Sequence, residues 1–231
     1  QPQLYGVKEI HERNNILISA PTGGTKTLTA FLSIINELVT RSVNKELQDR
    51  VYAVYLSPLK ALNNDVAINL STPLAEITER AKEKGITIDI RVGVRTGDTS
   101  PADRQKMLRK PPHILITTPE SLALMLTSYK FYELLRGADW CVVDEIHALA
   151  ENKRGVHLSL MLERLEHISP SLCRVGLSAT IEPLEEIAQY LVGTERSCKI
   201  AHVKMSKQVD MQVISPVPNL IDVSYEQNHR A

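Results

Sequence analysis

The feature that most constrains the fold of this 231-residue chain is the alternation of short β-branched runs with stretches of helical periodicity. Strands separated by helices pair in parallel, because each helical connection returns the chain to the same end of the sheet, and the helices then cover both faces. The predicted strands are Ile16–Ser19, Val51–Ser57, Ile88–Arg95, His113–Thr117, Trp140–Asp144 and Cys173–Ser178. The sequence therefore predicts an α/β fold with three layers and a mainly parallel central sheet.

Three helices carry clear signals of their own. The signals are the apolar face Phe31, Ile34, Ile35 and Leu38, the N-cap sequence Ser100-Pro101-Ala102-Asp103 before a helix to about Lys110, and Glu182-Pro183 before a helix that ends at Gly193. We expect one doubly wound unit over residues 1–193. Lys199–Val203 and Val209–Ser215 are weaker strand candidates, so residues 194–231 are expected to form terminal strands and a linker towards a second domain.

Composition and charge exclude several classes of protein. No run reaches the roughly 18 apolar residues of a membrane span, and no signal segment is visible, which predicts a soluble, cytoplasmic protein with no membrane partner. Lys and Arg total 27, as do Asp and Glu, so no global positive field would draw the chain to nucleic acid, and any such contact must be local. Cys141, Cys173 and Cys198 are odd in number and far apart, which favours buried free thiols.

A candidate phosphate loop follows the first strand and precedes the Phe31 helix. It runs Ala20-Pro21-Thr22-Gly23-Gly24-Thr25-Lys26-Thr27. In this context backbone amides cradle phosphate oxygens, the lysine reaches the β and γ phosphates, and the Thr27 hydroxyl binds Mg²⁺. The candidate nucleotide-binding residues are therefore Thr22, Gly23, Gly24, Thr25, Lys26 and Thr27.

Two positions depart from the generic phosphate loop, which has glycine where this chain has Ala20 and Thr25. A β-branched residue at position 25 would be strained if the backbone required a positive φ, and its side chain would crowd the approaching phosphate. We expect Thr25 to weaken nucleotide binding relative to glycine. By itself, the loop is equally compatible with a glycine-rich turn between a strand and a helix.

A pair of acids strengthens the assignment of a nucleotide site. Asp144 and Glu145 follow the apolar strand that begins at Trp140. At the end of a buried strand, Asp144 can hold Mg²⁺ through water, and Glu145 can polarise the water that attacks the γ-phosphate. His147 comes next, and we expect it to contact Ser178-Ala179-Thr180, which ends the following strand at the same edge of the sheet.

The motifs together resemble those of superfamily-two helicases. The first three are Ala20–Thr27, Asp144-Glu145-Ile146-His147 and Ser178-Ala179-Thr180. The stretches Tyr55–Leu62, Arg95–Thr99, Pro111–Leu122 and Lys153–Leu158 extend the likeness over nearly the whole chain and resemble the large helicase-related (Lhr) family. The resemblance implies the first RecA-like domain of an ATP-dependent translocase that moves 3′ to 5′ on single-stranded DNA or RNA, in DNA repair or RNA handling.

Residue roles also follow from the resemblance. It implies that ATP and Mg²⁺ are the cofactors, that Gln3 reads the adenine, that Lys26, Asp144 and Glu145 are catalytic, and that His147, Ser178 and Thr180 couple hydrolysis to movement. The implied strand-binding face is Ser57, Pro58, Lys60, Thr96, Gly97, Thr118 and Pro119. Phosphate repels carboxylates, so Asp98 and Glu120 are expected to cap helices or orient neighbours instead. The basic run Arg104, Lys106, Arg109 and Lys110 is expected to be a solvated helix face.

Two other classes of function stay open at this stage. Thr25 favours a nucleic-acid-binding scaffold whose phosphate loop has degenerated, whereas the intact Lys26, Thr27, Asp144 and Glu145 disfavour it. A small kinase or transporter ATPase would not account for Ser178-Ala179-Thr180. Because no segment after Gly193 offers the arginine of a second domain, we expect these residues alone to be nearly inert as an ATPase.

Overall fold

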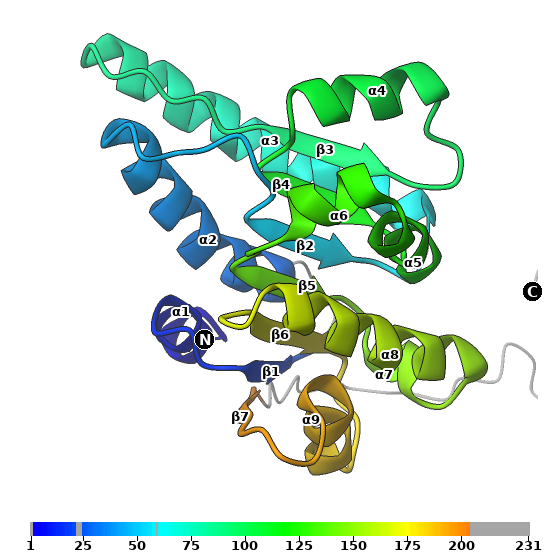
Figure 1. The fold of residues 1–231 in the computed structure, drawn as a ribbon. Helices are drawn as coiled ribbons and strands as arrows, with labels where there is room; N and C mark the ends of the chain where they lie inside the picture. Colours follow the sequence, from blue (N-terminus) through cyan, green and yellow to red (C-terminus); the bar gives the residue numbers. More distant parts are fainter. Residues whose placement is uncertain (1, 22–24, 59, 204–231) are drawn as a thin grey trace, which may run out of the picture.

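A single parallel sheet organises the molecule in the computed structural model, which describes residues 2–21, 25–58 and 60–203. Within these residues seven strands are hydrogen-bonded in the order β3-β4-β2-β5-β6-β1-β7 (Figure 1). They are β1 Ile16–Ser19, β2 Ala53–Leu56, β3 Val92–Arg95, β4 Ile114–Thr117, β5 Trp140–Val143, β6 Cys173–Ser178 and β7 Lys199–His202. All pairs are parallel, as predicted.

Helices cover both faces of the sheet and create two separate apolar cores (Figure 1). One face carries α1 Pro2–His11, α2 Thr25–Val43 and α3 Lys60–Glu83, and the other carries α5 Pro119–Thr127, α6 Tyr129–Leu135, α8 Lys153–Ile168 and α9 Leu184–Val192. Two more helices, α4 Pro101–Arg109 and α7 His147–Ala150, lie beside the second group. Strands β1, β2, β4, β5 and β6 are buried throughout, which is why they appear in the sequence as continuous apolar runs.

The strands are shorter than the apolar runs that predicted them. The run Ile88–Arg95 yields a strand only from Val92, because Val92 lies opposite Ile114, the first residue of its neighbour β4. Residues before Val92 therefore have no strand residue opposite them. The predicted α4 begins as expected, since the Ser100 side chain accepts a hydrogen bond from the backbone N–H of Asp103 at 3.1 Å.

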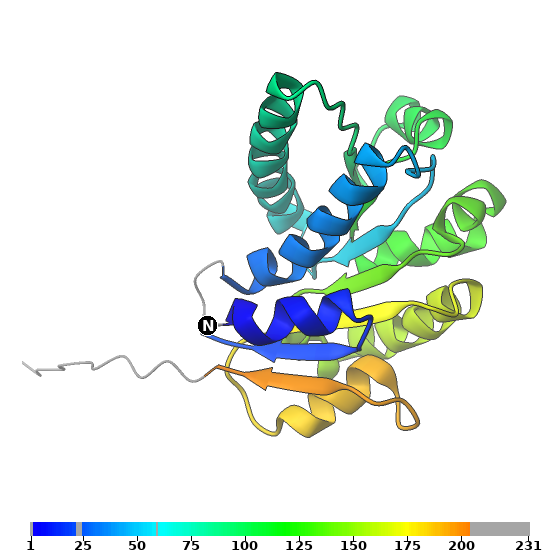
Figure 2. The same ribbon diagram turned by 90° about the vertical axis from the view of Figure 1, so that its left-hand side faces the viewer.

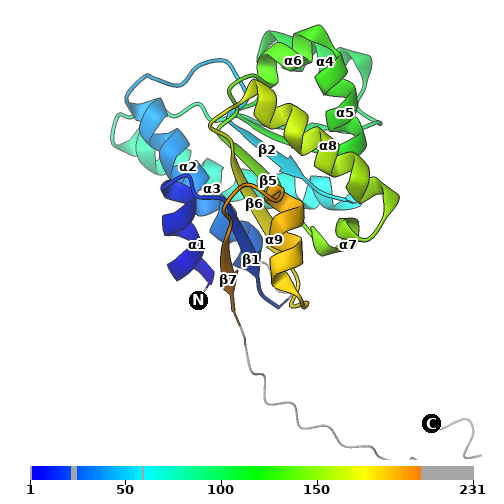
Figure 3. The ribbon, with the colours of Figure 1, turned by 60° about the horizontal axis from the view of Figure 1, so that its bottom comes forward.

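The sheet extends past Gly193, the residue at which the sequence analysis ended the doubly wound unit. Strand β7 pairs with β1, with Lys199 opposite Ile16, and α9 and α1 lie on opposite sides of these two strands (Figure 3). The candidate strand Val209–Ser215 lies outside the described residues. No helix of the described part of the chain combines the length and the apolar character that a bilayer span requires.

The three cysteines are free, as predicted. Cys141 and Cys173 are buried, but Cys198 is only half-buried.

Because the sheet is parallel, the carboxyl ends of its strands lie along one edge (Figure 2). The loop after β1, the turn after β5 that contains Asp144 and Glu145, and the end of β6 at Ser178 all lie at this edge. The chain order β1, β5, β6 becomes β5-β6-β1 in space. The fold thus brings together three motifs that are far apart in the sequence.

Gly155 allows α8 to begin directly against α7. A Cβ atom at this position would lie 1.9 Å from the backbone oxygen of Leu149 and 2.9 Å from the Tyr190 hydroxyl oxygen, which donates a hydrogen bond to the Gly155 carbonyl at 2.7 Å. Real Cβ atoms essentially never approach a backbone oxygen this closely. The start of α8 can therefore hold the turn that follows Asp144 and Glu145 only if residue 155 is glycine.

We expect Gly155→Ala to lower the free energy of unfolding by roughly 1–3 kcal/mol, as overpacking does. This loss outweighs the gain of about 1 kcal/mol that alanine brings inside a helix, because the Leu149 carbonyl cannot move without moving α7. Urea unfolding monitored by circular dichroism measures the change. Val156→Ala, at the next and 65% exposed position of the same helix, is the matched control. Equal stability of Gly155→Ala and the wild type would contradict this account of the contact.

Candidate nucleotide and nucleic-acid site

Lys26 is the second residue of α2, and its side chain turns back towards the end of β1. Its Nζ donates a hydrogen bond to the Ala20 carbonyl at 2.8 Å, and the residue is 5% exposed. Burial of an ammonium group is rare unless it is paired. A neutral carbonyl is a weaker partner for it than an anionic oxygen, so the lysine is disposed to bind a phosphate that enters between α2 and β1.

Thr25 is the first residue of α2, and its backbone therefore has the negative φ of a helix. The positive φ that would have strained a β-branched residue is not needed here. Thr22, Gly23 and Gly24 lie outside the described residues, as does the side chain of Thr25.

Asp144 lies one residue beyond β5 and is only 8% exposed. Its Oδ2 accepts a hydrogen bond from the Tyr55 hydroxyl, and its Oδ1 accepts one from the Glu145 backbone N–H at 3.0 Å. Burial raises the pKa of this carboxyl, and the Tyr55 hydrogen bond and the nearby Lys26 charge oppose that effect. The Thr27 side chain lies near the same hydroxyl and acts to lower its pKa. Tyr55 thus lies between the two residues that were predicted to hold Mg²⁺.

Glu145 adopts a backbone φ of 48°, in the left-handed region that residues other than glycine seldom enter. This conformation turns the chain sharply out of β5. The Glu145 carboxylate then lies 3.2 Å from His147 Nε2, with its side chain 32% exposed. Of the two acids, Asp144 is therefore enclosed, and Glu145 is accessible to water.

His147 contacts the end of β6, as the sequence predicted. Its Nδ1 accepts a hydrogen bond from the Ala179 backbone N–H at 3.3 Å and lies 3.3 Å from Ser178 Oγ. A backbone amide can only donate, so Nδ1 carries the lone pair and the ring proton resides on Nε2. Nε2 therefore donates to the Glu145 carboxylate, and the ring connects the acid pair to the end of β6.

The end of β6 is fixed by further contacts. Ser178 is fully buried, and its hydroxyl donates to the Ala179 carbonyl at 2.9 Å. The Ser19 hydroxyl at the end of β1 donates to the same carbonyl at 3.1 Å. Thr180 follows on the exposed side of the turn. A displacement of this turn would therefore affect both His147 and the start of the phosphate loop.

Gln3 lies on α1, the helix that packs against α2 beside the predicted nucleotide site. Gly6 is one helical turn further along the same face of α1, and a Cβ atom there would lie 2.6 Å from Thr29 Cγ2 and 2.9 Å from Ile18 Cδ1. The lack of a side chain at Gly6 lets α1 lie directly on the first turns of α2. The helix that carries Gln3 is consequently held against the helix that begins with Thr25, Lys26 and Thr27.

The residues predicted for the strand-binding face all lie at the carboxyl edge, after β2, β3 and β4. Most of their side chains are turned inward. Ser57 is fully buried, and Thr118 is 3% exposed and caps α5 by accepting a hydrogen bond from the Ser121 N–H at 3.3 Å. Gly97 is exposed, and Thr96 is 8% exposed. Pro58 and Pro119 are buried, and Lys60 begins α3 with its side chain outside the described residues.

Arg154 is a connecting residue to which the sequence analysis assigned no role. Its guanidinium donates to the Pro58 carbonyl at 2.9 Å and to Glu120 Oε1 at 2.7 Å. It thereby joins the end of β2 to the first turn of α5, and Glu120 orients a neighbour as expected. The two contacts bring together the loop after β2 and the first turns of α5 and α8, so spacing in the sequence does not reveal them.

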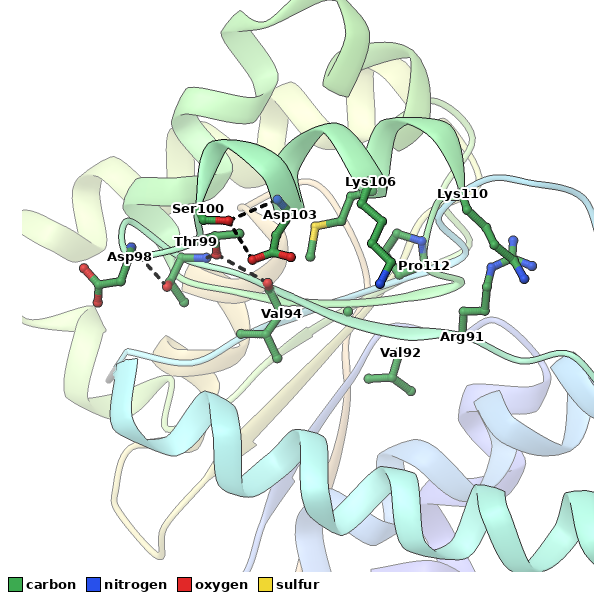
Figure 4. A pocket seen from close by; sticks show the side chains of 13 residues that line it. Arg91, Val92, Val94, Asp98, Thr99, Ser100, Asp103, Lys106, Lys110 and Pro112 are labelled. Carbon is green, nitrogen blue, oxygen red and sulfur yellow. Dashed lines mark hydrogen bonds between the residues drawn. The ribbon is translucent and has the colours of Figure 1, made fainter.

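The basic run of α4 is largely a solvated face, as expected, since Lys106, Arg109 and Lys110 are exposed and only Arg104 is half-buried. Arg104 donates to the carbonyl oxygens of Thr99 at 2.9 Å and Gly97 at 3.0 Å. Lys106 and Lys110 line a cavity of about 790 Å³ between α4 and the edge strand β3, and Lys106 extends into it (Figure 4). Helix α4 has no buried residue, so it can lie away from β3 and leave this space.

Comparisons with known proteins agree with the site geometry. A family model described as DEAD/DEAH box helicase matches residues 1–187, and the chain belongs to this family. Its fold is that of the RecA-like helicase domains. The DEAD-box helicase Mss116 bound to ssRNA and UDP-BeF superposes with a TM-score of 0.73 at 22% identity over 87% of this chain and 39% of that one, a likeness of fold alone.

Within the family, the chain is a domain of the Lhr type. It is 57% identical over 227 residues to the ATP-dependent helicase Lhr-Core of Methanocaldococcus jannaschii, covering 98% of this chain and 27% of that protein. It is 43% identical over 232 residues to the Lhr helicase/uracil glycosylase of Escherichia coli K12, at 97% and 15% coverage.

A solved structure extends this likeness. The Mycobacterium smegmatis helicase Lhr bound to ssDNA and AMP-PNP superposes with a TM-score of 0.85 at 42% identity, over 99% of this chain and 29% of that one. The chain thus spans about a quarter of the length of the archaeal relative and of this structure.

The His147 contacts predict a ring tautomer that can be measured. In a long-range ¹H–¹⁵N spectrum of the ¹⁵N-labelled domain at pH 8, His147 should show a protonated Nε2 and an unprotonated Nδ1. The His147→Gln variant, which loses the signal, assigns it. Observation of the opposite tautomer would show that the Ala179 N–H does not donate to this ring.

Proposed function

We propose that this domain binds ATP with Mg²⁺ at the carboxyl edge of the sheet and supplies half of the motor of an ATP-dependent helicase. The observation that carries the proposal is the convergence of a buried lysine, Lys26, with the acids Asp144 and Glu145 and with His147. Each of them comes from a strand end or a helix start at the same edge. A buried ammonium and a buried carboxylate at this place suit a ligand that carries both phosphate and a cation.

The residues present fit Mg²⁺. The Thr27 hydroxyl and the Asp144 carboxylate are both hard oxygen ligands; Asp144 accepts a hydrogen bond from Tyr55, and Thr27 lies near the same phenol. Magnesium is commonly held by one or two protein oxygens together with nucleotide phosphates and water rather than by a full cage of side chains. When bound, the ion would neutralise charge on the phosphates, which Lys26 also does.

Glu145 is the proposed base for hydrolysis. Its carboxylate is accessible to water and is oriented by the Nε2–H of His147. An attacking water held by Glu145 would lie beside phosphates bound at the start of α2. His147 also contacts the end of β6, so a change in the bound nucleotide that moves His147 would also move the turn that contains Ser178 and Thr180. We propose these two as coupling residues.

The adenine would be read by Gln3. The direct packing of α1 on α2 at Gly6 supports this role, because it holds the helix that carries Gln3 against the helix that begins with Thr25 and Lys26. Thr22, Gly23, Gly24 and Thr25 would bind phosphate mainly through backbone amides, which a helix start provides whatever its side chains are.

Single-stranded nucleic acid is the proposed substrate, and the helicase would move along it in the 3′ to 5′ direction. The turns at Ser57-Pro58, Thr96-Gly97 and Thr118-Pro119, together with Lys60, would contact its backbone. The Ser57 and Thr96 backbone N–H groups already donate within the protein and the two prolines have none, so these turns suit a contact through shape, which carries no base sequence. Relatives were solved with ssDNA and with ssRNA, so either strand is a candidate for this chain.

A second RecA-like domain would complete the motor. An arginine that reaches the γ-phosphate from a partner domain accelerates related phosphoryl transfers by about 10³–10⁵. This chain covers only 27% of the length of the Methanocaldococcus jannaschii relative. That share is consistent with a larger protein that carries such a domain. The domain by itself would bind nucleotide but turn it over very slowly.

The proposal is tested by ATP hydrolysis in the full-length protein, measured with single-stranded DNA and RNA of equal length. We expect stimulation by at least one strand, and Glu145→Gln should lower turnover by roughly 10²–10⁴, the usual contribution of a general base, with little change in nucleotide affinity. The exposed Glu151, at the end of the next helix, provides the matched control Glu151→Gln. The polypeptide of residues 1–231 alone should bind nucleotide without strand-stimulated turnover.

A degenerate scaffold domain predicts a different result. If the full-length protein bound nucleic acid but neither bound nor hydrolysed ATP, the motor function would be refuted and the scaffold function supported. Strand-stimulated turnover by residues 1–231 alone would refute the need for a second domain.

A further inference from the structure

Tyr55 is the buried residue at the site whose role neither the sequence motifs nor the proposed chemistry explains. It lies in β2, is fully buried, and packs its ring against Phe31 of α2 with 5.4 Å between the ring centroids. Valine, isoleucine or leucine would satisfy an apolar strand position of this kind. The phenol adds a polar atom to the core, and such an atom is costly unless it is hydrogen-bonded.

The sheet register explains where the hydroxyl goes. Tyr55 lies opposite Val142 of β5, and Asp144 is two residues further along on the same face of the sheet. The hydroxyl therefore reaches the carboxylate at the end of the neighbouring strand and donates to its Oδ2. It also meets Thr27 of the first turn of α2. One hydroxyl thus connects β2, β5 and the start of α2.

The contact has an electrostatic consequence for Asp144. A carboxylate that is 8% exposed loses most of its hydration and needs hydrogen-bond donors to remain ionised. The phenol supplies one such donor without bringing a competing charge. A phenol has an ordinary pKa of about 10, so a tyrosine hydroxyl is protonated at neutral pH and can donate such a hydrogen bond.

We propose that Tyr55 is a positioning residue of the nucleotide site, whose hydroxyl holds the Asp144 carboxylate beside Thr27 in the arrangement that takes up Mg²⁺ with the nucleotide. The inference rests on the proposed ATP function and goes beyond it by assigning a role to a fully buried residue that the proposed chemistry does not use. Tyr55 acts through Asp144. Its removal should therefore weaken the contribution of Mg²⁺ to nucleotide binding and spare the contribution of Lys26 and the backbone amides.

The test measures binding of a fluorescent ATP analogue to the full-length protein, once with excess Mg²⁺ and once with EDTA. The ratio of the two dissociation constants reports the contribution of the cation. In Tyr55→Phe we expect this ratio to fall by about tenfold, the lower end of the effect of losing a hydrogen bond to a charged group. The affinity in EDTA should stay within twofold of the wild type. Raising the Mg²⁺ concentration should restore part of the lost affinity.

Tyr52, the residue directly before the same strand, provides the matched control. It is 1% exposed, and its hydroxyl accepts a hydrogen bond from the Gln48 backbone N–H at 2.9 Å, at the opposite end of β2 from the site. Tyr52→Phe removes a comparable buried hydroxyl, so it should leave the Mg²⁺ ratio unchanged. Thermal unfolding of both variants shows whether either one loses its fold.

A double-mutant cycle tests whether Tyr55 acts through Asp144. Asp144→Asn should reduce the Mg²⁺ ratio, and adding Tyr55→Phe to it should cause no further reduction. Additive losses would overturn the proposal, because they would mean that Tyr55 acts independently of Asp144. An equal loss of affinity in Mg²⁺ and in EDTA would also overturn it, since that pattern belongs to a general packing role.

The outcomes separate this inference from the proposed function. A wild-type protein that binds no nucleotide under either condition would refute the ATP function itself. If the wild type binds nucleotide with a clear Mg²⁺ ratio and Tyr55→Phe keeps that ratio, only the role of Tyr55 is overturned. If the wild type binds nucleotide equally well with and without Mg²⁺, the role of Tyr55 is likewise overturned, but nucleotide binding itself is not.

Discussion

The whole site depends on the parallel pairing of the strands. Because every strand runs in the same direction, each one delivers its last residues to the same edge, where the N-terminus of α2 also lies. Lys26 and Asp144 are more than a hundred positions apart in the chain, yet β5, β6 and β1 are neighbours in the sheet. Helix starts add amide groups, and strand ends add side chains held by a buried backbone. An antiparallel strand in the centre of the sheet would send its motif to the opposite edge.

Much of the fold could be predicted from the sequence, because a strand buried on both faces of a parallel sheet appears as an unbroken apolar run. The limits of the strands could not be predicted, since they depend on the neighbour. Ile88 is buried but precedes the first residue of β3 that has a strand partner. Strand β7 gave a weak signal because Lys199 and Ile200 at the sheet edge are exposed. Helix α3 continues through Pro73, a residue that usually argues against a helix interior.

For the site, the sequence indicated the residues that carry the chemistry but not those that hold them in place. Lys26, Asp144, Glu145 and His147 each directly follow a strand or begin a helix, which is a local pattern. Tyr55 is indistinguishable from an apolar strand residue until the register shows that Asp144 lies within reach of its hydroxyl. The guanidinium of Arg154 likewise joins the loop after β2 to the start of α5, two segments that only the folded chain brings together. The residue most at odds with the motif, Thr25, is accommodated because it begins a helix.

The central claim is that the phosphates of ATP bind between the start of α2 and Asp144. The most direct test is a crystal structure of this domain with Mg²⁺ and a non-hydrolysable ATP analogue. The account predicts that Lys26 Nζ leaves the Ala20 carbonyl for the β and γ phosphates and that the cation lies between Thr27 and Asp144. A nucleotide bound elsewhere, with Lys26 still on the Ala20 carbonyl and Asp144 still enclosed, would contradict it.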